Sequence, residues 1–343
     1  MNRRKGLVHR IAVASMAISL ALSATGCQFG PPAQQGGKIA VIAQAQGVQF
    51  WDLLKEGAQD AGSEIGYEID YSCAQAASDW AGQKELIQKA LDEHVDGIVL
   101  APNSPTELSD VLQAADNAEI PVIVVSSNVN YPGVQSYIGS DNTNAGMIAG
   151  REAVAELGAS GNVGIIGHSN TASNALSRIE GFESALSQLN GPSTFSTDAD
   201  GNVVTVTKYN VVKKDFSNGQ RDGTKDTAIN MIQSNPEINL IFATNENSTL
   251  GVCDAIVELG KIGEIKVIGF NASDDELTYI KNGTLSATVV QSPYNMGYLG
   301  VRYIDAFRSG ESLAKTYDTG AMIVNSSNIN DEIIQLWVSP QQN

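Results

Sequence analysis

Short apolar segments alternate with stretches of helical periodicity along the chain from residue 38 onward. Runs of mostly apolar residues, which predict buried strands, occupy 39–43, 67–71, 97–101, 121–125, 136–139, 163–166, 203–209, 240–243, 266–270 and 286–290, and residues 323–324 open a last extended segment. Helices are predicted between them, near 50–64, 79–93, 105–118, 143–157, 174–189, 222–234, 249–259, 274–282 and 294–308. This order predicts the α/β class, with two doubly wound parallel sheets.

The length of the chain favours two domains, because 343 residues exceed what a single hydrophobic core usually organises. The charge balance is acidic, with 38 Asp and Glu residues against 21 Lys and Arg residues and a formal net charge of −17. Nucleic acid is therefore excluded as a partner, since binding to phosphates requires a basic surface.

The N-terminus has the pattern of an export signal. Four basic residues within the first ten are followed by an uncharged apolar run, 11–24, which is too short to span a bilayer, and then by Gly26-Cys27. This resembles a bacterial lipoprotein signal, in which residues 1–26 are removed and Cys27 carries lipid; a plain secretory signal is the alternative. Residues 27–37, rich in Pro, Gln and Gly, predict a flexible tether. Removing residues 1–26 takes away four positive charges and no negative one, so the net charge becomes −21.

Catalytic, cofactor and metal motifs are not found in the sequence. No GxSxG, HExxH, Walker A or ordered G-x-G-x-x-G pattern occurs, so no enzyme activity, cofactor or metal is predicted. His94 is expected to be a solvated helix end, and His168 follows a strand without a carboxylate or thiol neighbour. Cys73 and Cys253 are interpreted as small core residues rather than metal ligands or a disulfide.

Amide and hydroxyl side chains follow most of the predicted strands. They are Gln44, Asn103, Ser126, Ser127, Asn128, Ser169, Asn170, Asn245, Asn247, Asn271 and Gln291, and the imidazole of His168 stands among them. Because ligands of open α/β sheets bind beyond the carboxyl ends of the strands, these groups predict a site for a neutral, hydroxyl-rich molecule. Phe50 and Trp51 would cover its apolar side. Asn and Ser are also common in turns and helix caps, and Trp51 could instead pack within its own domain.

Several motifs resemble one family along residues 38–326: KIAVIAQAQGVQFWDLLKEGAQDAGSEIGY, VDGIVLAPNSP, IPVIVV, YIGSDNTNAGMIAG, SRIEGFESAL, LIFATNENSTLGVCDAI, KVIGFNASDD and LSATVVQSPYNMG. They are similar to sugar-binding proteins of ABC importers, in the ribose-binding (type I periplasmic binding protein) family. The resemblance implies crossings between lobes near 140–141, 292–293 and 320–321. The N-terminal lobe would comprise 38–140 and 293–320, and the C-terminal lobe 141–292 and 321–343. LacI-type repressors share this fold, but they carry a DNA-binding segment where this chain has an export signal.

The resemblance also implies a function. The lobes would close by a hinge motion on a small-molecule ligand, and the closed form would be recognised by a membrane permease with its ATPase. The protein would be a monomer outside the cytoplasm, held by its N-terminal lipid to the bacterial cell membrane. A sensing module that presents its ligand to a membrane receptor is the alternative function.

The ligand-binding residues of the family can be carried over one by one. The aromatic contacts fall on Phe50, Trp51 and Phe216, and the polar contacts that are kept fall on Gln44, Asn245 and Gln291. The family pattern is lost at three places, where Ser126-Ser127 replaces Asp-Arg, Asn271 replaces Asp, and Leu176 replaces a pocket Arg. Arg178 is retained, and Asn174 is expected to supply a replacement contact. These changes disfavour ribose and favour another neutral polyol, and they allow a carboxylated ligand only if Arg178 faces the pocket.

Overall fold

The computed structural model describes residues 36–191, 194–197 and 203–338. The predicted signal peptide, 1–26, the predicted lipidation site, Cys27, and all but the last two residues of the predicted tether lie outside these residues. Within them, no helix is both long enough and apolar enough to cross a membrane.

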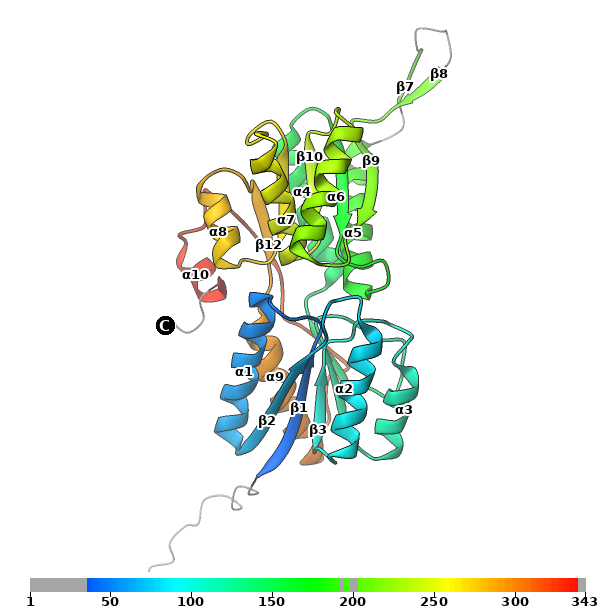
Figure 1. The fold of residues 1–343 in the computed structure, drawn as a ribbon, viewed down its shortest axis with the longest axis vertical. Helices are drawn as coiled ribbons and strands as arrows, with labels where there is room; N and C mark the ends of the chain where they lie inside the picture. The colour runs from blue at the N-terminus through cyan, green and yellow to red at the C-terminus, as the bar shows by residue number, and fades with distance from the viewer. Residues whose placement is uncertain (1–35, 192–193, 198–202, 339–343) are drawn as a thin grey trace, which may run out of the picture. The chain divides into compact units, whose positions relative to one another are not determined.

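The first sheet has six parallel strands and forms the N-terminal lobe (Figure 1). Its order is β13 (Thr316–Asp318), β5 (Ser136–Gly139), β4 (Val122–Val125), β3 (Gly97–Leu100), β1 (Gly37–Ala43) and β2 (Tyr67–Cys73). Alternate residues of β1 face opposite sides: Ile39 and Val41 pack with helices α1 (Gln49–Ile65) and α9 (Pro293–Arg308), whereas Ala40 and Ile42 pack with α2 (Trp80–Asp92) and α3 (Ser109–Asn117). Strands covered on both faces explain the continuous apolar runs of the sequence.

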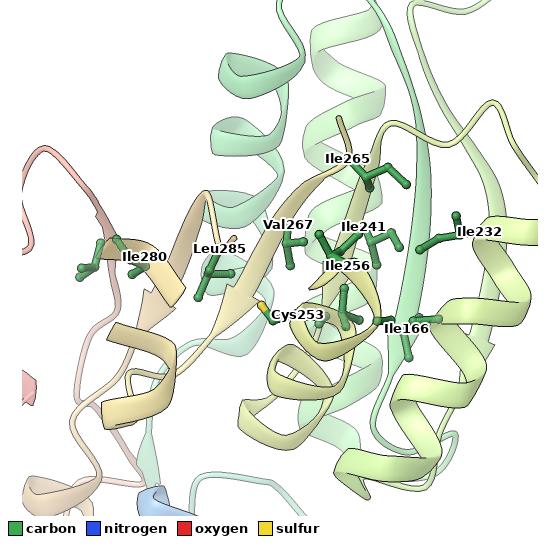
Figure 2. Packing of buried hydrophobic residues seen from close by; sticks show 14 of the residues in the cluster. Ile166, Ile232, Ile241, Cys253, Ile256, Ile265, Val267, Ile280 and Leu285 are labelled. Carbon is green, nitrogen blue, oxygen red and sulfur yellow. The ribbon is translucent and has the colours of Figure 1, made fainter. Parts of the chain in front are cut away.

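The second sheet forms the C-terminal lobe and has the order β14 (Met322–Asn325), β12 (Ala287–Val290), β11 (Lys266–Phe270), β10 (Leu240–Ala243), β6 (Gly161–Gly167) and β9 (Tyr209–Phe216). All pairs are parallel except β12 with β14. One face is covered by α4 (Asn142–Leu157) and α5 (Ser173–Asn190). The other face is covered by α6 (Arg221–Ser234), α7 (Glu246–Glu258), α8 (Asp274–Lys281) and α10 (Glu332–Val338), and Figure 2 shows the buried aliphatic residues of this layer.

Glycines allow one close helix crossing in each lobe. A Cβ atom on Gly57 of α1 or on Gly297 of α9 would collide with the backbone of the other helix. The same holds for Gly146 of α4 and Gly181 of α5. Each lobe is therefore covered on one face by two helices that touch backbone to backbone, which leaves little room for change at the crossing.

The chain passes between the two sheets three times: after β5, after β12 and between β13 and β14. The predicted α/β class and the paired doubly wound sheets are confirmed by this topology. The predicted strand at 203–209 is wrong in extent, because it is divided between β8 (Val203–Val206), which pairs with β7 (Thr194–Thr197) in a separate hairpin, and β9. Strand β9 lies at the edge of the sheet and contains Lys213 and Lys214, so it lacks the apolar run of a buried strand.

Two smaller features also differ from expectation. The predicted extended segment that opens at 323–324 is the short strand β14; within the described residues it is followed by α10, a helix that was not predicted, whose Ile334 and Val338 are buried against the C-terminal lobe. Cys73 and Cys253 are both free thiols; Cys253 is buried in the core, whereas Cys73 is only half-buried. His94 is exposed, as expected.

Candidate functional site

A cavity lies where the carboxyl ends of strands from both sheets meet. The space between the atoms that line it, counted together with the adjoining open solvent, is about 390 Å3. Its lining from the N-terminal lobe is Gln44, Ala45, Val48, Phe50, Trp51, Ala77 and Ser126, and its lining from the C-terminal lobe is His168, Asn174, Arg178, Gly219, Asn245, Asn271 and Gln291. Nine of the eleven predicted ligand-binding residues are among them. The position follows the rule that ligands of open α/β sheets bind beyond the carboxyl ends of the strands.

Two adjacent aromatic residues form the apolar wall. Phe50 and Trp51 are in the first turn of α1, and their rings meet edge to face with centroids 4.7 Å apart. Both are also buried in the hydrophobic core of the N-terminal lobe. Trp51 therefore packs within its own domain and also lines the cavity, two roles that the sequence presented as alternatives.

Two predicted contacts are not part of the cavity lining. The Oγ atom of Ser127 lies 3.0 Å from Oγ of Ser173, so this side chain connects the lobes instead. Phe216, at the end of β9, packs into the core of the C-terminal lobe, where its ring covers Gly167. Leu176, which occupies the position of a family arginine, is exposed.

Arg178 is a buried cation on the cavity wall, with 2% of its surface exposed. Its Nε donates to Asn142 Oδ1 at 2.8 Å, its Nη1 donates to the Thr244 carbonyl oxygen at 2.8 Å, and its Nη2 donates to Gln291 Oε1 at 3.1 Å. The guanidinium also lies 3.8 Å from the ring centroid of Phe270. Burial lowers the pKa of Arg178 to about 9, so it is still charged at neutral pH.

The side-chain amides of the C-terminal lobe are oriented by groups that can only donate. Arg178 fixes the oxygen of Gln291, whose Nε2 then donates to Asn271 Oδ1 at 2.9 Å. The backbone N–H of Ser248 fixes the oxygen of Asn245 at 3.0 Å, and the N–H of Ala175 fixes that of Asn174 at 2.8 Å. In all four amides the oxygen is used within the protein.

Gln44 is the polar group of the N-terminal lobe with the best-defined orientation. Its Nε2 donates to the Pro102 carbonyl oxygen at 2.7 Å, which leaves its Oε1 as an acceptor on the cavity side. Asn103, another polar residue at a strand end, donates to the backbone of Gln44 and Ala76 and supports the loop beneath.

His168 is held in its neutral form. Burial, together with the nearby charge of Arg178, lowers its pKa to about 3. Thr244 Oγ1 accepts from the His168 backbone N–H at 3.0 Å and lies 2.8 Å from Nδ1, while Nε2 lies 3.3 Å from Asn174 Oδ1. Because Asn174 Oδ1 can only accept, this arrangement fits an imidazole protonated on Nε2. Its hydroxyl partner, Thr244, is fully buried and does not line the cavity, so this hydroxyl is not placed to attack a ligand there.

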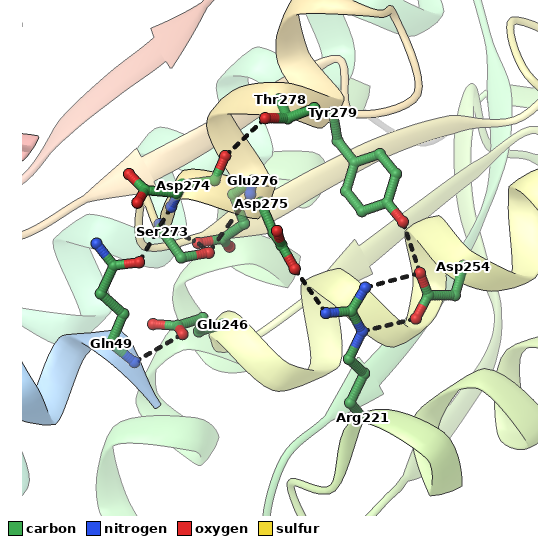
Figure 3. Close-up of polar contacts among 10 residues, drawn as sticks. All are labelled: Gln49, Arg221, Glu246, Asp254, Ser273, Asp274, Asp275, Glu276, Thr278 and Tyr279. Atoms are coloured by element: carbon green, nitrogen blue, oxygen red, sulfur yellow. Dashed lines mark hydrogen bonds and ion pairs between the residues drawn. The ribbon is translucent and has the colours of Figure 1, made fainter. Parts of the chain in front are cut away.

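A carboxylate of the C-terminal lobe caps a helix of the N-terminal lobe. Glu246, the first residue of α7, accepts a hydrogen bond from the backbone N–H of Gln49 at 2.8 Å (Figure 3). It accepts a second one from the backbone N–H of Phe50 at 3.1 Å. These are the first residues of α1, and the N-cap residue Val48 supplies no side-chain cap of its own. In return, Gln49 Oε1 accepts from the N–H of Asp274 at the start of α8, at 3.1 Å. The two lobes therefore exchange helix caps.

Glu246 lies between the predicted polar residues Asn245 and Asn247, and no role of its own could be assigned to it from the sequence, because that role depends on the packing of the other lobe. Burial raises the pKa of Glu246, and the two N–H groups oppose this rise. Neighbouring Glu276, which completes a capping box with Ser273, also has its pKa raised by burial. Arg221 is paired with Asp254 and Asp275, with an N–O distance of 2.7 Å in each pair, and Figure 3 shows both contacts.

Comparison with known proteins gives consistent matches along the chain. A family model described as a periplasmic binding protein domain matches residues 39–312. The ribose import binding protein of Bacillus subtilis is 27% identical over 91% of this chain and 96% of its own length. The D-allose-binding periplasmic protein of Escherichia coli is 25% identical over 83% of this chain and 89% of its own.

Solved structures give the same result. A carbohydrate transporter solute-binding protein from Agrobacterium radiobacter, in complex with D-arabinose, has a TM-score of 0.80 and 28% identity, and the match covers 89% of this chain and 100% of that one. An ABC transporter solute-binding protein from Agrobacterium vitis with bound D-fucose has the same TM-score and identity, over 88% and 100%. Together with the two sheets and their three connections, these matches confirm the family inferred from the motifs: the chain belongs to the periplasmic binding protein family.

Proposed function

We propose that this protein is the extracytoplasmic solute-binding component of an ABC importer, which captures a sugar or a similar polyhydroxylated small molecule between its lobes and delivers it to a membrane permease. The observation that carries the proposal is the cavity itself. Side chains from the strand ends of both sheets line it with amides, a hydroxyl and two aromatic rings. Relatives that cover nearly the whole chain bind ribose or allose, and structural neighbours hold arabinose or fucose, which supports the same ligand class.

The proposed ligand contacts follow the chemistry of the wall. Phe50 and Trp51 would cover the C–H face of a sugar ring, while amides and the Ser126 hydroxyl would bind its oxygen atoms. A ligand that contacts both lobes favours the closed arrangement over an open one, and recognition of the closed form by a permease turns binding into transport.

We assign no enzymatic step to this site. His168 is neutral, its hydroxyl partner Thr244 lies outside the cavity lining, and no thiol or carboxylate lines the cavity within the described part of the chain. The homologous family consists of binding proteins. The proposal extends to a monomer attached to the cell membrane through lipid on Cys27, which is supported by the sequence pattern of the N-terminus.

A thermal-shift panel of sugars, polyols and nucleosides tests the proposed function. At least one compound should raise the melting temperature, because a ligand that binds only the folded state stabilises it in proportion to the logarithm of its concentration over Kd. Substitution Trp51→Ala should abolish that shift, and Trp80→Ala, which changes an exposed tryptophan on α2, should preserve it. The ligand-induced shift is compared rather than the melting temperature itself, since Trp51 also belongs to the core. A panel with no active compound would contradict the proposal.

A further inference from the structure

The side chains around the cavity offer mainly hydrogen-bond donors. The oxygens of Asn174, Asn245, Asn271 and Gln291 all accept bonds from within the protein. Their amide nitrogens have further N–H groups to give: no hydrogen bond within the described residues uses Nδ2 of the three asparagines, and Gln291 Nε2 uses only one of its two. On the acceptor side, the cavity has Oε1 of Gln44 and the hydroxyl of Ser126.

The cavity also carries an uncompensated positive charge. Arg178 has five N–H donors, of which three are used, all on neutral oxygens. No carboxylate lines the cavity among the described residues, and His168 is neutral. The nearest interlobe carboxylate, Glu246, faces neighbouring spaces and is bonded to α1. Buried charges are normally paired, because removing a lone ion from water is costly.

We infer that the solute is a monosaccharide-sized sugar acid, an aldonate or uronate, whose carboxylate is bound by Arg178 and the adjacent amide nitrogens of Gln291 and Asn271. This inference rests on the proposed function and names the ligand class of that site. It departs from the neutral ligand expected from the sequence, because the structure places Arg178 on the wall of the cavity with N–H groups to spare.

The remaining chemistry of the cavity fits such a molecule. One cation matches the single charge of a carboxylate, whereas a phosphate ester carries close to two negative charges at neutral pH. Carboxylate oxygens only accept hydrogen bonds, so they suit a cluster that only donates. The hydroxyl groups of the same molecule both donate and accept, and they can donate to Gln44 Oε1 and Ser126 Oγ at the opposite side of the cavity, in the N-terminal lobe.

Matched ligand pairs separate this inference from the proposed function. Isothermal titration of the purified, ligand-free protein at pH 7.5 would compare D-glucuronate with D-glucose, D-galacturonate with D-galactose, D-gluconate with D-glucitol and D-ribonate with D-ribose. At least one acid should bind about tenfold or more tightly than its neutral partner, since hydrogen bonds to a charged group are stronger than those to a neutral one. Neutral compounds that bind at least as tightly as their acids would overturn the inference and leave the proposed function standing. A set in which nothing binds would contradict the proposed function itself.

A charge substitution tests the same point within the protein. Replacing Arg178 would disturb the anchor of several loops, so the informative variant is Asn271→Asp, which keeps the oxygen that accepts from Gln291 and adds a negative charge. Asn271 has a φ of +87°, a conformation that Asp also tolerates. The variant should lower the ratio of acid to neutral affinity by about tenfold or more, because the added negative charge repels the carboxylate of the acid but not its neutral partner.

The matched control is Asn282→Asp, the same chemical change at the exposed end of α8, where the side chain accepts from the N–H of Thr284. It should leave both affinities unchanged. If Asn271→Asp and Asn282→Asp have the same ratio of acid to neutral affinity, Arg178 does not select the charge of the ligand and the inference is wrong.

Discussion

Closure of the lobes should depend on pH through Glu246. Only 4% of this residue is exposed, and burial raises the pKa of its carboxyl group from 4.5 to about 7, against the opposing effect of the N–H groups of Gln49 and Phe50. The charges of Asp52 on α1 and Asp275 on α8 add to the rise. Separating the lobes removes α1 from this carboxyl group and admits water, so its pKa in the open form should return toward the ordinary value.

Proton linkage determines whether affinity rises or falls with pH. Because the pKa is higher in the closed form, the closed form binds more protons than the open form between about pH 4.5 and 7. Protonation of Glu246 therefore favours the closed form. This contribution is fully present below the pKa of the open form and is lost as the pH rises through the pKa of the closed form. With a shift from 4.5 to about 7, affinity should fall roughly tenfold to thirtyfold between pH 5.5 and pH 8. Glu276 is buried within the C-terminal lobe itself, so separation of the lobes should change its surroundings less than those of Glu246.

Isothermal titration with the cognate solute at pH 5.5, 6.5, 7.5 and 8 measures this effect. A sugar acid is ionised throughout this range, so the ligand adds no titration of its own. Substitution Glu246→Gln should remove most of the pH dependence. The control Glu258→Gln changes an exposed carboxylate at the other end of α7, where it pairs with Lys225, and should keep the dependence. A wild-type affinity that is flat or rises with pH would refute the reasoning, as would an unchanged slope in Glu246→Gln.

Three further predictions concern packing, closure and attachment. In a urea titration, Gly181→Ala should lower the free energy of unfolding by about 1–3 kcal/mol, because the added methyl group collides with the α4 backbone. The control Gly223→Ala, in an open position of α6, should be neutral or slightly stabilising in the same titration. Ser127→Ala removes the interlobe hydrogen bond to Ser173 and should weaken ligand affinity by about tenfold or less. The melting temperature of the ligand-free protein should be unchanged. A loss of stability without a loss of affinity would assign this bond to folding instead. Cys27→Ala should release the protein from the membrane fraction of its host and abolish incorporation of labelled palmitate, and a variant that remains labelled would exclude lipidation at this cysteine.

Much of the fold could be predicted because its strands are buried on both faces. Segments such as Ile98–Leu100 and Val122–Val125 are apolar at every position, so they stand out from the helical periodicities between them. The edge strand β9 was not predicted, since it carries the consecutive exposed residues Lys213 and Lys214 and lacks an apolar run. The hairpin of β7 and β8 lies outside the two main sheets, and the apolar alternation of Val203–Val206 does not indicate its partner.

The site could be predicted as far as the topology determines it. Gln44, Ser126, Asn245, Asn271 and Gln291 all lie at the ends of strands that converge, and they line one cavity. The side-chain directions could not be predicted in this way.

The side chain of Phe216 packs against the core of its own lobe instead of lining the cavity. The three hydrogen-bond partners of Arg178 come from segments that are 36 to 113 residues distant in sequence. The exchange of helix caps through Glu246 depends on contact between the lobes, which no local pattern in the sequence encodes.

Native mass spectrometry of the protein purified from cells grown in rich medium should detect the enclosed solute itself. We expect a single non-covalent adduct per monomer, with the mass of a monosaccharide-sized acid, that is absent from the Trp51→Ala variant. A protein that carries no adduct under conditions that preserve weak complexes, or one whose adduct persists in Trp51→Ala, would contradict the claim that the two lobes enclose a small polyhydroxylated solute at this cavity.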